Sequence, residues 1–247
     1  MAHIIGTAGW SIPTAEAECF PAEGTSLERY AAHFSGAEIN SSFHRSHRPS
    51  TWQRWAESVP EAFRFSAKVP KTITHKQKLV ECEALLDAYL AEAGALGDKL
   101  AVHLVQLPPS LAFDAALVGN FFAQLQSRTA VAIACEPRHA SWFEAEADAL
   151  LTELHIARVA ADPALSPAAA VPGGWGGLAY FRLHGSPVRY RSSYEEERLQ
   201  AYARQIEASG AQDIWCIFDN TASSAATGNA LRLTELLEPA CTDPARR

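Results

Sequence analysis

The stretch that decides the fold is VAIACEPRHASW, residues 131–142, where an apolar run ends at a carboxylate, a guanidinium and an imidazole. Residues 131–135 contain no glycine or proline, and such a short apolar run is typical of a strand covered on both faces. Glu136, Arg138 and His139 follow where this strand would leave the core. A carboxylate beside a fixed cation can stay ionised when partly desolvated, which suits a base, an electrostatic clamp or a metal ligand. For one strand alone, a structural ion pair that holds a loop explains the pattern equally well.

Apolar strands and amphipathic helices alternate along the whole chain. Short apolar runs predict eight strands, at residues 4–6, 37–40, 63–69, 100–107, 131–135, 157–161, 178–184 and 214–218. Helical spacing of apolar residues predicts seven helices, at residues 26–34, 50–59, 79–96, 114–126, 144–154, 194–208 and 223–237. After the sixth strand, PALSPAAAVPGGWGG (residues 163–177) holds three prolines and four glycines, so we expect a loop there instead of a helix.

This alternation predicts an α/β fold, a single TIM (β/α)8 barrel over residues 1–247 in which a loop replaces the helix after strand six. No change in composition divides the chain, so we expect one domain, with a frayed tail from about residue 239. An open, doubly wound sheet is the alternative, although neither GxGxxG nor GxxxxGK[ST] occurs in the sequence.

The composition is that of an ordinary soluble protein, with 48% hydrophobic and 20% charged residues. Five cysteines form no CxxC pair, which favours reduced thiols. There is no signal-peptide pattern and no apolar run of membrane-spanning length, so we expect a cytoplasmic protein without a membrane partner. The net charge of -7 argues against general coating of nucleic acid, yet residues 43–78 hold eight Lys or Arg against two acids. This basic island can focus anions toward one part of the surface.

In such a barrel the carboxyl ends of all strands meet on one face, where active sites lie. Polar side chains occur at each predicted strand end, Asp162 of the sixth strand included, and we expect them to form one hydrogen-bonded ring around water or ligand. Because side chains alternate along a strand, Glu38 and Asn40 should point into the same cavity. The candidate catalytic residues are Glu136, His184, Lys68 and Asp219. The candidate ligand-binding residues are Arg182, Arg138, Glu38, Asn40, Gln106, His139, Trp10, Trp142, Tyr190 and Asn220.

Seven separated motifs carry a resemblance to a known family. They are GTAGW (6–10), EINSSFHR (38–45), FSAKVPKTITH (65–75), QLPPSLAFD (106–114), EPRHASW (136–142), YFRLHG (180–185) and IFDNTASSAA (217–226). Together, and in this order, they resemble the YecE-like family, with His44 where that family is expected to have Tyr. The resemblance implies a TIM-barrel fold in a bacterial-type cytosolic protein. It implies no reaction, because the family is a domain of unknown function.

The chemistry we predict is anion binding coupled to proton transfer. Lys68, Arg138 and Arg182 would hold a phosphate or carboxylate, since a planar guanidinium grips an oxyanion at two points. Glu136 or His184 would exchange a proton, while aromatic side chains stack on a sugar or base face. This predicts a hydrolase, lyase or isomerase that acts on a phosphorylated or otherwise anionic, ring-bearing substrate, such as a sugar phosphate or nucleotide, without an organic cofactor.

Three alternatives stay open. A divalent metal could bind, as in endonuclease IV-type barrels and sugar isomerases by fold-level analogy, although the nearby Lys and Arg can neutralise the same carboxylates. Its ligands would be Glu38, Glu136, His184 and Asp219. The protein could instead be a module that binds a nucleic-acid end or phosphorylated ligand without turnover. A Schiff base at Lys68 needs a depressed pKa of its amine. If the ring serves only the ligand, Glu136→Gln and Arg182→Ala should leave the melting profile nearly intact.

Overall fold

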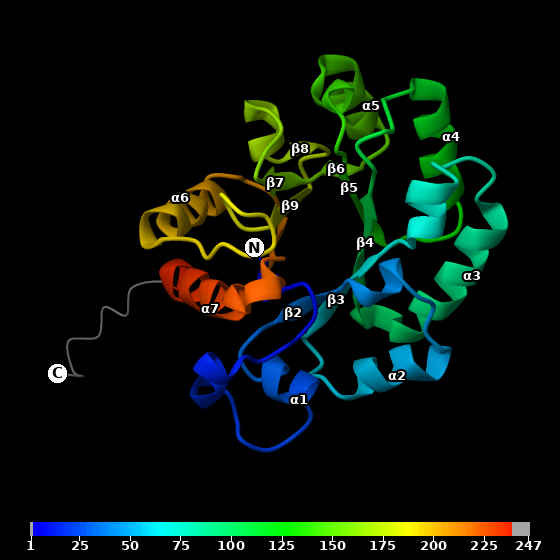
Figure 1. The fold of residues 1–247 in the computed structure, drawn as a ribbon. Helices are drawn as coiled ribbons and strands as arrows, with labels where there is room; N and C mark the ends of the chain where they lie inside the picture. The colour runs from blue at the N-terminus through cyan, green and yellow to red at the C-terminus, as the bar shows by residue number, and fades with distance from the viewer. Residues whose placement is uncertain (1, 239–247) are drawn as a thin grey trace.

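A computed structural model describes residues 2–238, and in it strands and helices alternate along the chain (Figure 1). The strands are β1 (Ala2–Thr7), β2 (Gly36–Ile39), β3 (Arg64–Lys68), β4 (Leu100–Gln106), β5 (Ala132–Glu136), β6 (Ala157–Arg158), β7 (Ala160–Asp162), β8 (Gly173–Gly174), β9 (Leu178–Leu183) and β10 (Asp213–Phe218). The helices are α1 (Ser26–Ala31), α2 (Pro49–Glu57), α3 (Glu83–Ala93), α4 (Ala115–Gln126), α5 (Ala145–Glu153), α6 (Glu196–Glu207) and α7 (Ala225–Leu237). Each predicted strand and helix has a counterpart. The predicted frayed tail lies outside the described residues.

The strands pair into two sheets. One sheet has the order β1-β10-β9-β7 and the other β2-β3-β4-β5-β6-β8, and every pairing is parallel except that of β6 with β8. The predicted sixth strand is divided at Val159, so that β6 pairs with β5 and β7 pairs with β9. At the other border, Ala8 forms an isolated parallel bridge to Glu38. The pattern is therefore α/β with parallel sheets, and pairing is sparse at both borders between them.

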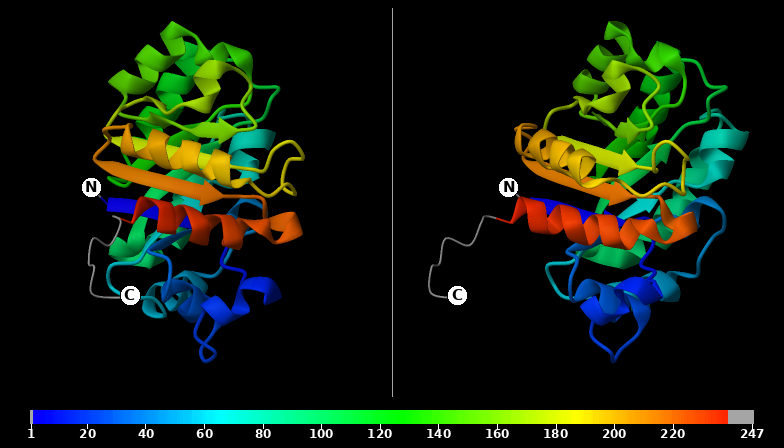
Figure 2. Two further views of the ribbon diagram at one scale, coloured as in Figure 1. Left: turned by 90° about the vertical axis from the view of Figure 1, so that its left-hand side faces the viewer. Right: turned by 60° about the vertical axis from the view of Figure 1, so that its left-hand side comes forward.

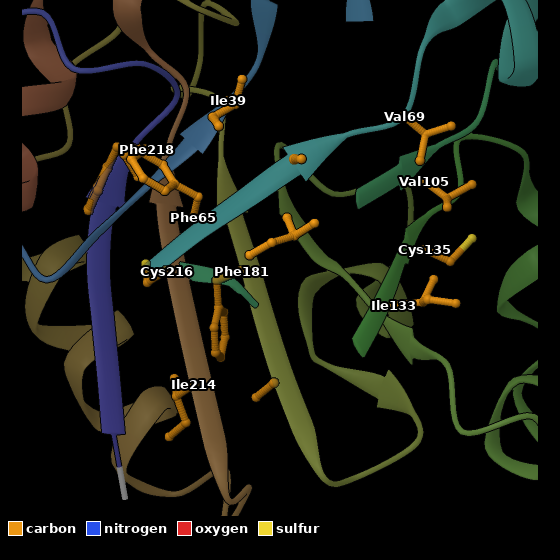
Figure 3. Close-up of a cluster of buried hydrophobic side chains, with 14 of the residues drawn as sticks. Ile39, Phe65, Val69, Val105, Ile133, Cys135, Phe181, Ile214, Cys216 and Phe218 are labelled. Carbon is orange, nitrogen blue, oxygen red and sulfur yellow. The ribbon is translucent and has the colours of Figure 1, made fainter. Parts of the chain in front are cut away.

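Side chains of the strands alternate between two apolar clusters. Ile39, Phe65, Ile133, Phe181 and Ile214 belong to the cluster between strands and helices (Figure 3). The inner cluster is formed by Ile4, Val102, Leu104, Ala134, Ala157, Val159, Leu178, Tyr180, Trp215 and Ile217. Every second side chain along a strand points to the same face, so the inner apolar residues of each strand are followed on that face by a polar residue at its carboxyl end. These polar residues are Gln106, Glu136, Arg182 and Asp219.

Helices cover the other face of the strands, and local capping sets where some of them begin. Figure 2 shows α6 and α7 side by side along β9 and β10. Asp114 accepts a hydrogen bond from the backbone N–H of Leu117 at 2.9 Å and so starts α4. Thr25 and Glu28 form a capping box at the start of α1. These caps satisfy backbone donors that the first turn of a helix leaves free.

The segment from residue 163 to 177 contains no α-helix, as its prolines and glycines predict. It forms a short 3-10 turn (Pro167–Ala170) and then β8, which pairs antiparallel with β6. The backbone N–H of Gly174 donates to Asp148 Oδ1 at 2.9 Å, which ties β8 to α5. The loop prediction is confirmed.

Two further predictions concern the compartment. Among residues 2–238, no helix combines the length and the apolar character that crossing a bilayer requires. Cys19, Cys82, Cys135 and Cys216 are free thiols. The cytoplasmic location stays a prediction.

Candidate functional site

Arg182 on β9 is the centre of a buried ion-pair network at the carboxyl ends of the strands. Its Nε and Nη2 donate to the two oxygens of Glu38 at 2.9 and 2.6 Å. Its Nη1 donates to Glu136 Oε2 at 2.7 Å, and Nη2 also donates to Asp219 Oδ2 at 3.1 Å. The side chain is 0% exposed. The guanidinium therefore connects β2, β5 and the residue that follows β10, and its burial leaves no surface for a ligand.

His184 closes the network on the other side of Glu136. Its Nδ1 lies 3.0 Å from Asp219 Oδ2, and its Nε2 lies 2.8 Å from Glu136 Oε1. Arg138 Nη2 is hydrogen-bonded to Glu136 Oε1 and lies 2.7 Å from His184 Nε2. Arg138 Nη2 can only donate and Glu136 Oε1 can only accept, so the tautomer of His184 decides which of these two contacts of Nε2 is a hydrogen bond. The ring thus holds an imidazole whose two nitrogens both face charged partners.

Glu136 is an ionised carboxylate whose two oxygens lie among hydrogen-bonding side chains. Burial alone would raise the pKa of Glu136, but Arg138, Arg182 and His184 together hold it well below its usual range. Gln106 donates to Oε2 at 2.8 Å, so Oε2 accepts from Gln106 and Arg182. Oε1 accepts from Arg138 and lies 2.8 Å from His184 Nε2. Glu136 is consequently poorly suited to accept a proton from a substrate.

Lys68, at the end of β3, is the charged group that the network leaves unpaired. Among residues 2–238, no carboxylate oxygen lies within 4.0 Å of its Nζ. The amine instead lies 4.1 Å from the centre of the Phe43 ring, and the residue is 5% exposed. Burial, followed by the positive charge of Arg182, lowers the pKa of Lys68 to about 8, against the opposing carboxylates. Its amine can therefore be neutral or charged near physiological pH.

The lowered pKa of Lys68 predicts how stability depends on pH. Between about 8 and the ordinary value of 10.5, the unfolded chain binds a proton that the folded chain does not. The free energy of unfolding of the wild type should therefore rise, relative to a Lys68→Met variant, as pH increases through this window. Urea unfolding of both proteins at several pH values between 7 and 10.5 measures the difference. A constant difference would show that folding leaves the pKa of the amine unchanged, and a falling difference would show that folding raises it; either result would contradict the prediction.

A cationic cavity of about 210 Å³ lies over this network. It is lined by His75, Gln106, Leu107, Pro109, Arg138, Leu165, Arg189 and Tyr190, and we call it the mouth cavity. Burial and the nearby charges of Lys68, Arg138 and Lys71 lower the pKa of His75, which reports a positive potential there. Tyr190 packs edge-on against His184, with ring centres 5.6 Å apart, and is 42% exposed. The mouth cavity thus combines cations with an accessible aromatic ring.

Two other predicted residues line a separate cavity. Trp10 and Asn40 lie with Gly9, Ser11 and Ser41 around a cavity of about 440 Å³. Asn40 does not share the cavity of Glu38, contrary to the prediction, because the strand ends at Ile39 and Asn40 adopts helical dihedral angles. Only Glu38 therefore keeps the inward direction of β2.

Four predicted residues lie outside the network. Trp142 is 0% exposed and its Nε1 donates to the Leu111 carbonyl at 2.9 Å, so it is a core residue and offers no ring face for stacking. His139 caps a 3-10 turn through Ser141. Asn220 donates to Ser192 and Asn229, because its side chain alternates with that of Asp219. The same alternation turns Asp162 away from the network. Arg198 on α6 donates to it at 2.9 Å, and Tyr194, which precedes α6, donates at 2.8 Å.

The metal-binding alternative does not fit the described residues. No group of three His, Cys, Asp or Glu side chains within residues 2–238 is arranged to hold an ion. The four ligands proposed for this alternative were Glu38, Glu136, His184 and Asp219. Arg182 binds all three of these carboxylates, and Arg138 lies against Glu136 and His184. A cation would have to displace two guanidiniums, so we derive no metal chemistry at this site.

Several residues of the site were not among the candidates from the sequence. His75 and Arg189 line the mouth cavity, and Phe43, one of the aromatic residues expected to stack on a ligand, covers the Lys68 amine. His75 and Phe43 lie in the basic island of residues 43–78, which was the available signal for them. Arg189 comes from a loop after β9 whose direction no sequence pattern indicates. Ser66 and Tyr180 bind each other at 2.7 Å beneath the network, and Tyr180 also donates to Glu38 at 3.1 Å.

The fold and site define a class: parallel α/β proteins in which a buried ion-pair network at the strand ends lies under a cationic cavity. The chain belongs to the DUF72 family, described as a protein of unknown function, whose sequence profile matches residues 4–247.

The resemblance to the YecE-like family is thereby confirmed. The chain is 36% identical over 84 residues to the UPF0759 protein YecE of Escherichia coli K12. This match spans 34% of the chain and 31% of that curated relative.

Solved structures of similar proteins agree with the fold. A DUF72 family protein of Enterococcus faecalis V583 superposes with a TM-score of 0.81 at 21% identity, covering 96% of each chain. One from Thermotoga maritima MSB8 gives 0.80 at 22%, covering 97% of this chain and 100% of that one. A xylose isomerase-like TIM barrel/4-hydroxyphenylpyruvate dioxygenase fusion protein gives 0.52 at 14%, covering 96% of this chain and 42% of that one. At these identities the likeness concerns the fold alone.

Proposed function

We propose that this protein is an enzyme that binds a small anionic, ring-bearing substrate in the mouth cavity, with Arg138 and Lys68 as the groups that meet the anion. The observation that carries this proposal is the unpaired Lys68 amine, which packs on the Phe43 ring while His75 of the mouth cavity packs on the same ring. Burying a charge without a partner is costly, so such a group is usually paired. An anionic ligand would supply the missing partner.

The burial of some charged side chains and the exposure of others to the mouth cavity support the same proposal. Arg182 and Glu136 are each 0% exposed and hold the other side chains in place. Arg138 connects the buried network with the mouth cavity, because one nitrogen binds Glu136 while the residue also lines the cavity. Tyr190 offers an exposed ring on which a sugar or base could stack. The cations that line the mouth cavity are thus Arg138 and Arg189, whereas Arg182 is buried beneath them.

Proton transfer is assigned to Lys68 and His184 rather than to Glu136. Glu136 is held ionised by the cations around it, whereas the lowered pKa of Lys68, about 8, suits an acid or base near neutral pH. His184 is buried between Glu136 and Asp219 and could exchange a proton only through a neighbour in the network. The reaction class stays within hydrolase, lyase or isomerase chemistry.

We also propose that the two sheets together form one (β/α)8 barrel. The isolated bridge from Ala8 to Glu38, and a hydrogen bond of 2.8 Å from the Gly9 N–H to the Glu38 carbonyl, support closure at one border. There Gly6 lies so close to the Gly36 carbonyl that a side chain on Gly6 would collide with it. At the other border only Val159 separates β6 from β7. Closure would bring the ends of all strands around one mouth.

The proposal is tested by titrating the protein calorimetrically with inorganic phosphate and with ribose 5-phosphate. We expect Arg138→Gln to weaken the binding of either anion about 10- to 100-fold, because a hydrogen bond to a charged group contributes about 1.5–3 kcal/mol. Arg128→Gln is the matched control, since Arg128 pairs with Asp87 at the exposed surface and lines no part of the mouth cavity. Equal affinity in both variants, or no binding by the wild type, would contradict the proposal. Single-stranded DNA titrated in parallel tests the nucleic-acid alternative.

A further inference from the structure

We propose that the Lys68 amine is a nucleophile that condenses with the carbonyl group of the substrate to form a Schiff base. This inference rests on the proposed function and deepens it, because it names the substrate class: an aldehyde or ketone that also carries a phosphate or carboxylate. The anion would be held by Arg138, and the carbonyl carbon would meet Nζ of Lys68.

The geometry around Lys68 supports this role. Arg182 binds the three carboxylates at the network centre, and among residues 2–238 no carboxylate oxygen lies within 4.0 Å of Lys68 Nζ. The Phe43 ring covers one side of the amine at 4.1 Å. His75, which lines the mouth cavity, packs edge-on against the same ring at 5.0 Å between ring centres. The amine is therefore largely desolvated, and one aromatic ring separates it from His75, which lines the mouth cavity.

The electrostatic surroundings favour the reactive, neutral form of the amine. A lysine becomes a nucleophile when it is desolvated or lies next to another cation. Both causes act here, since burial and the charge of Arg182 lower the pKa of Lys68 to about 8. By contrast, Lys76 and Lys78 on the following segment are exposed. Lys68 should thus react at a pH where surface lysines are almost fully protonated.

The step balances without any further reagent. The Nζ lone pair forms a bond to the carbonyl carbon, and the carbonyl oxygen takes up a proton to give a carbinolamine. The hydroxyl group of the carbinolamine then takes up a proton and leaves as water, and the C=N bond forms. One amine and one carbonyl are consumed, and one imine and one water are formed. Nothing is oxidised or reduced until a hydride reagent is added from outside.

Reductive trapping tests the inference. The full-length protein is incubated with pyruvate, glycolaldehyde phosphate or ribose 5-phosphate in the presence of cyanoborohydride, which reduces an imine to a stable secondary amine. Peptide mapping by mass spectrometry then locates the adduct. We expect one adduct per chain, at Lys68, with at least one of the three probes and at a rate at least 10-fold above that of any exposed lysine.

Two matched variants separate this inference from the anion site. Lys68→Arg keeps the positive charge but cannot form an imine, so it should bind inorganic phosphate and yield no adduct at this position. Lys76→Arg removes an exposed lysine of the same segment and should leave trapping unchanged. Phosphate binding without trapping of any probe would overturn the Schiff base while the proposed function stands. Adducts spread evenly over exposed lysines would also overturn it. Failure of both binding and trapping would overturn both proposals.

Discussion

Replacing Arg182 by Met is expected to lower the free energy of unfolding by about 3–5 kcal/mol, because it leaves Glu38, Glu136 and Asp219 buried without their shared cation. When one partner of a buried ion pair is removed, the desolvation penalty of the remaining charge is no longer compensated, and the folded state is destabilised. Urea unfolding followed by circular dichroism measures the loss. The sequence alone favoured a nearly intact melting profile for Arg182→Ala, and the buried geometry reverses that expectation.

The matched control for this prediction is Arg182→Lys. Lysine keeps the charge but lacks the planar fork that binds both oxygens of Glu38, so we expect a smaller loss than for Met. A second check is pH. Carboxylates that have lost Arg182 should protonate more readily, so the deficit of Arg182→Met should shrink as the pH is lowered. A loss below about 1 kcal/mol for Met at neutral pH, a typical surface value, would show that the network does not depend on the guanidinium.

Replacing Trp142 by Ala is expected to lower the free energy of unfolding by about 3–5 kcal/mol, as for other large-to-small core substitutions. The indole is 0% exposed, packs against Phe113 with ring centres 5.3 Å apart and donates to the Leu111 carbonyl. Anion binding at the mouth cavity should survive below the unfolding transition, because Trp142 does not line that cavity. Denaturant unfolding and phosphate titration of the same variant measure both quantities.

Two variants bracket this second prediction. Trp142→Phe keeps one aromatic ring but removes the N–H donor and part of the buried indole, so its loss should be smaller than that of Ala, about 1–3 kcal/mol. Tyr190→Ala removes an exposed ring of the mouth cavity and should weaken binding of ribose 5-phosphate with little effect on stability. If Trp142→Ala instead kept its stability and lost binding, the indole would belong to the ligand site, as the sequence suggested.

Most of the fold was predictable because burial leaves a direct record in the sequence. A parallel strand covered on both faces is an apolar run, and a helix that packs on it shows one apolar stripe. The loop at residues 163–177 was predictable too, since prolines and glycines disfavour a helix. The split of the sixth strand at Val159 was not, because it depends on where β5 and β9 lie relative to each other.

From the sequence alone follow the order of the elements and the gathering of Glu38, Lys68, Gln106, Glu136 and Asp219 at one end of the strands. Both are local properties, set by apolar periodicity and by the alternation of side chains along each strand. Only the tertiary structure decided the roles. It buried Arg182 under three carboxylates and left Lys68 unpaired, because which charge meets which depends on distances between strands far apart in the chain. It also placed Trp142 in the core and turned Asp162 and Asn220 away, since a shift of one residue reverses the face to which a side chain points.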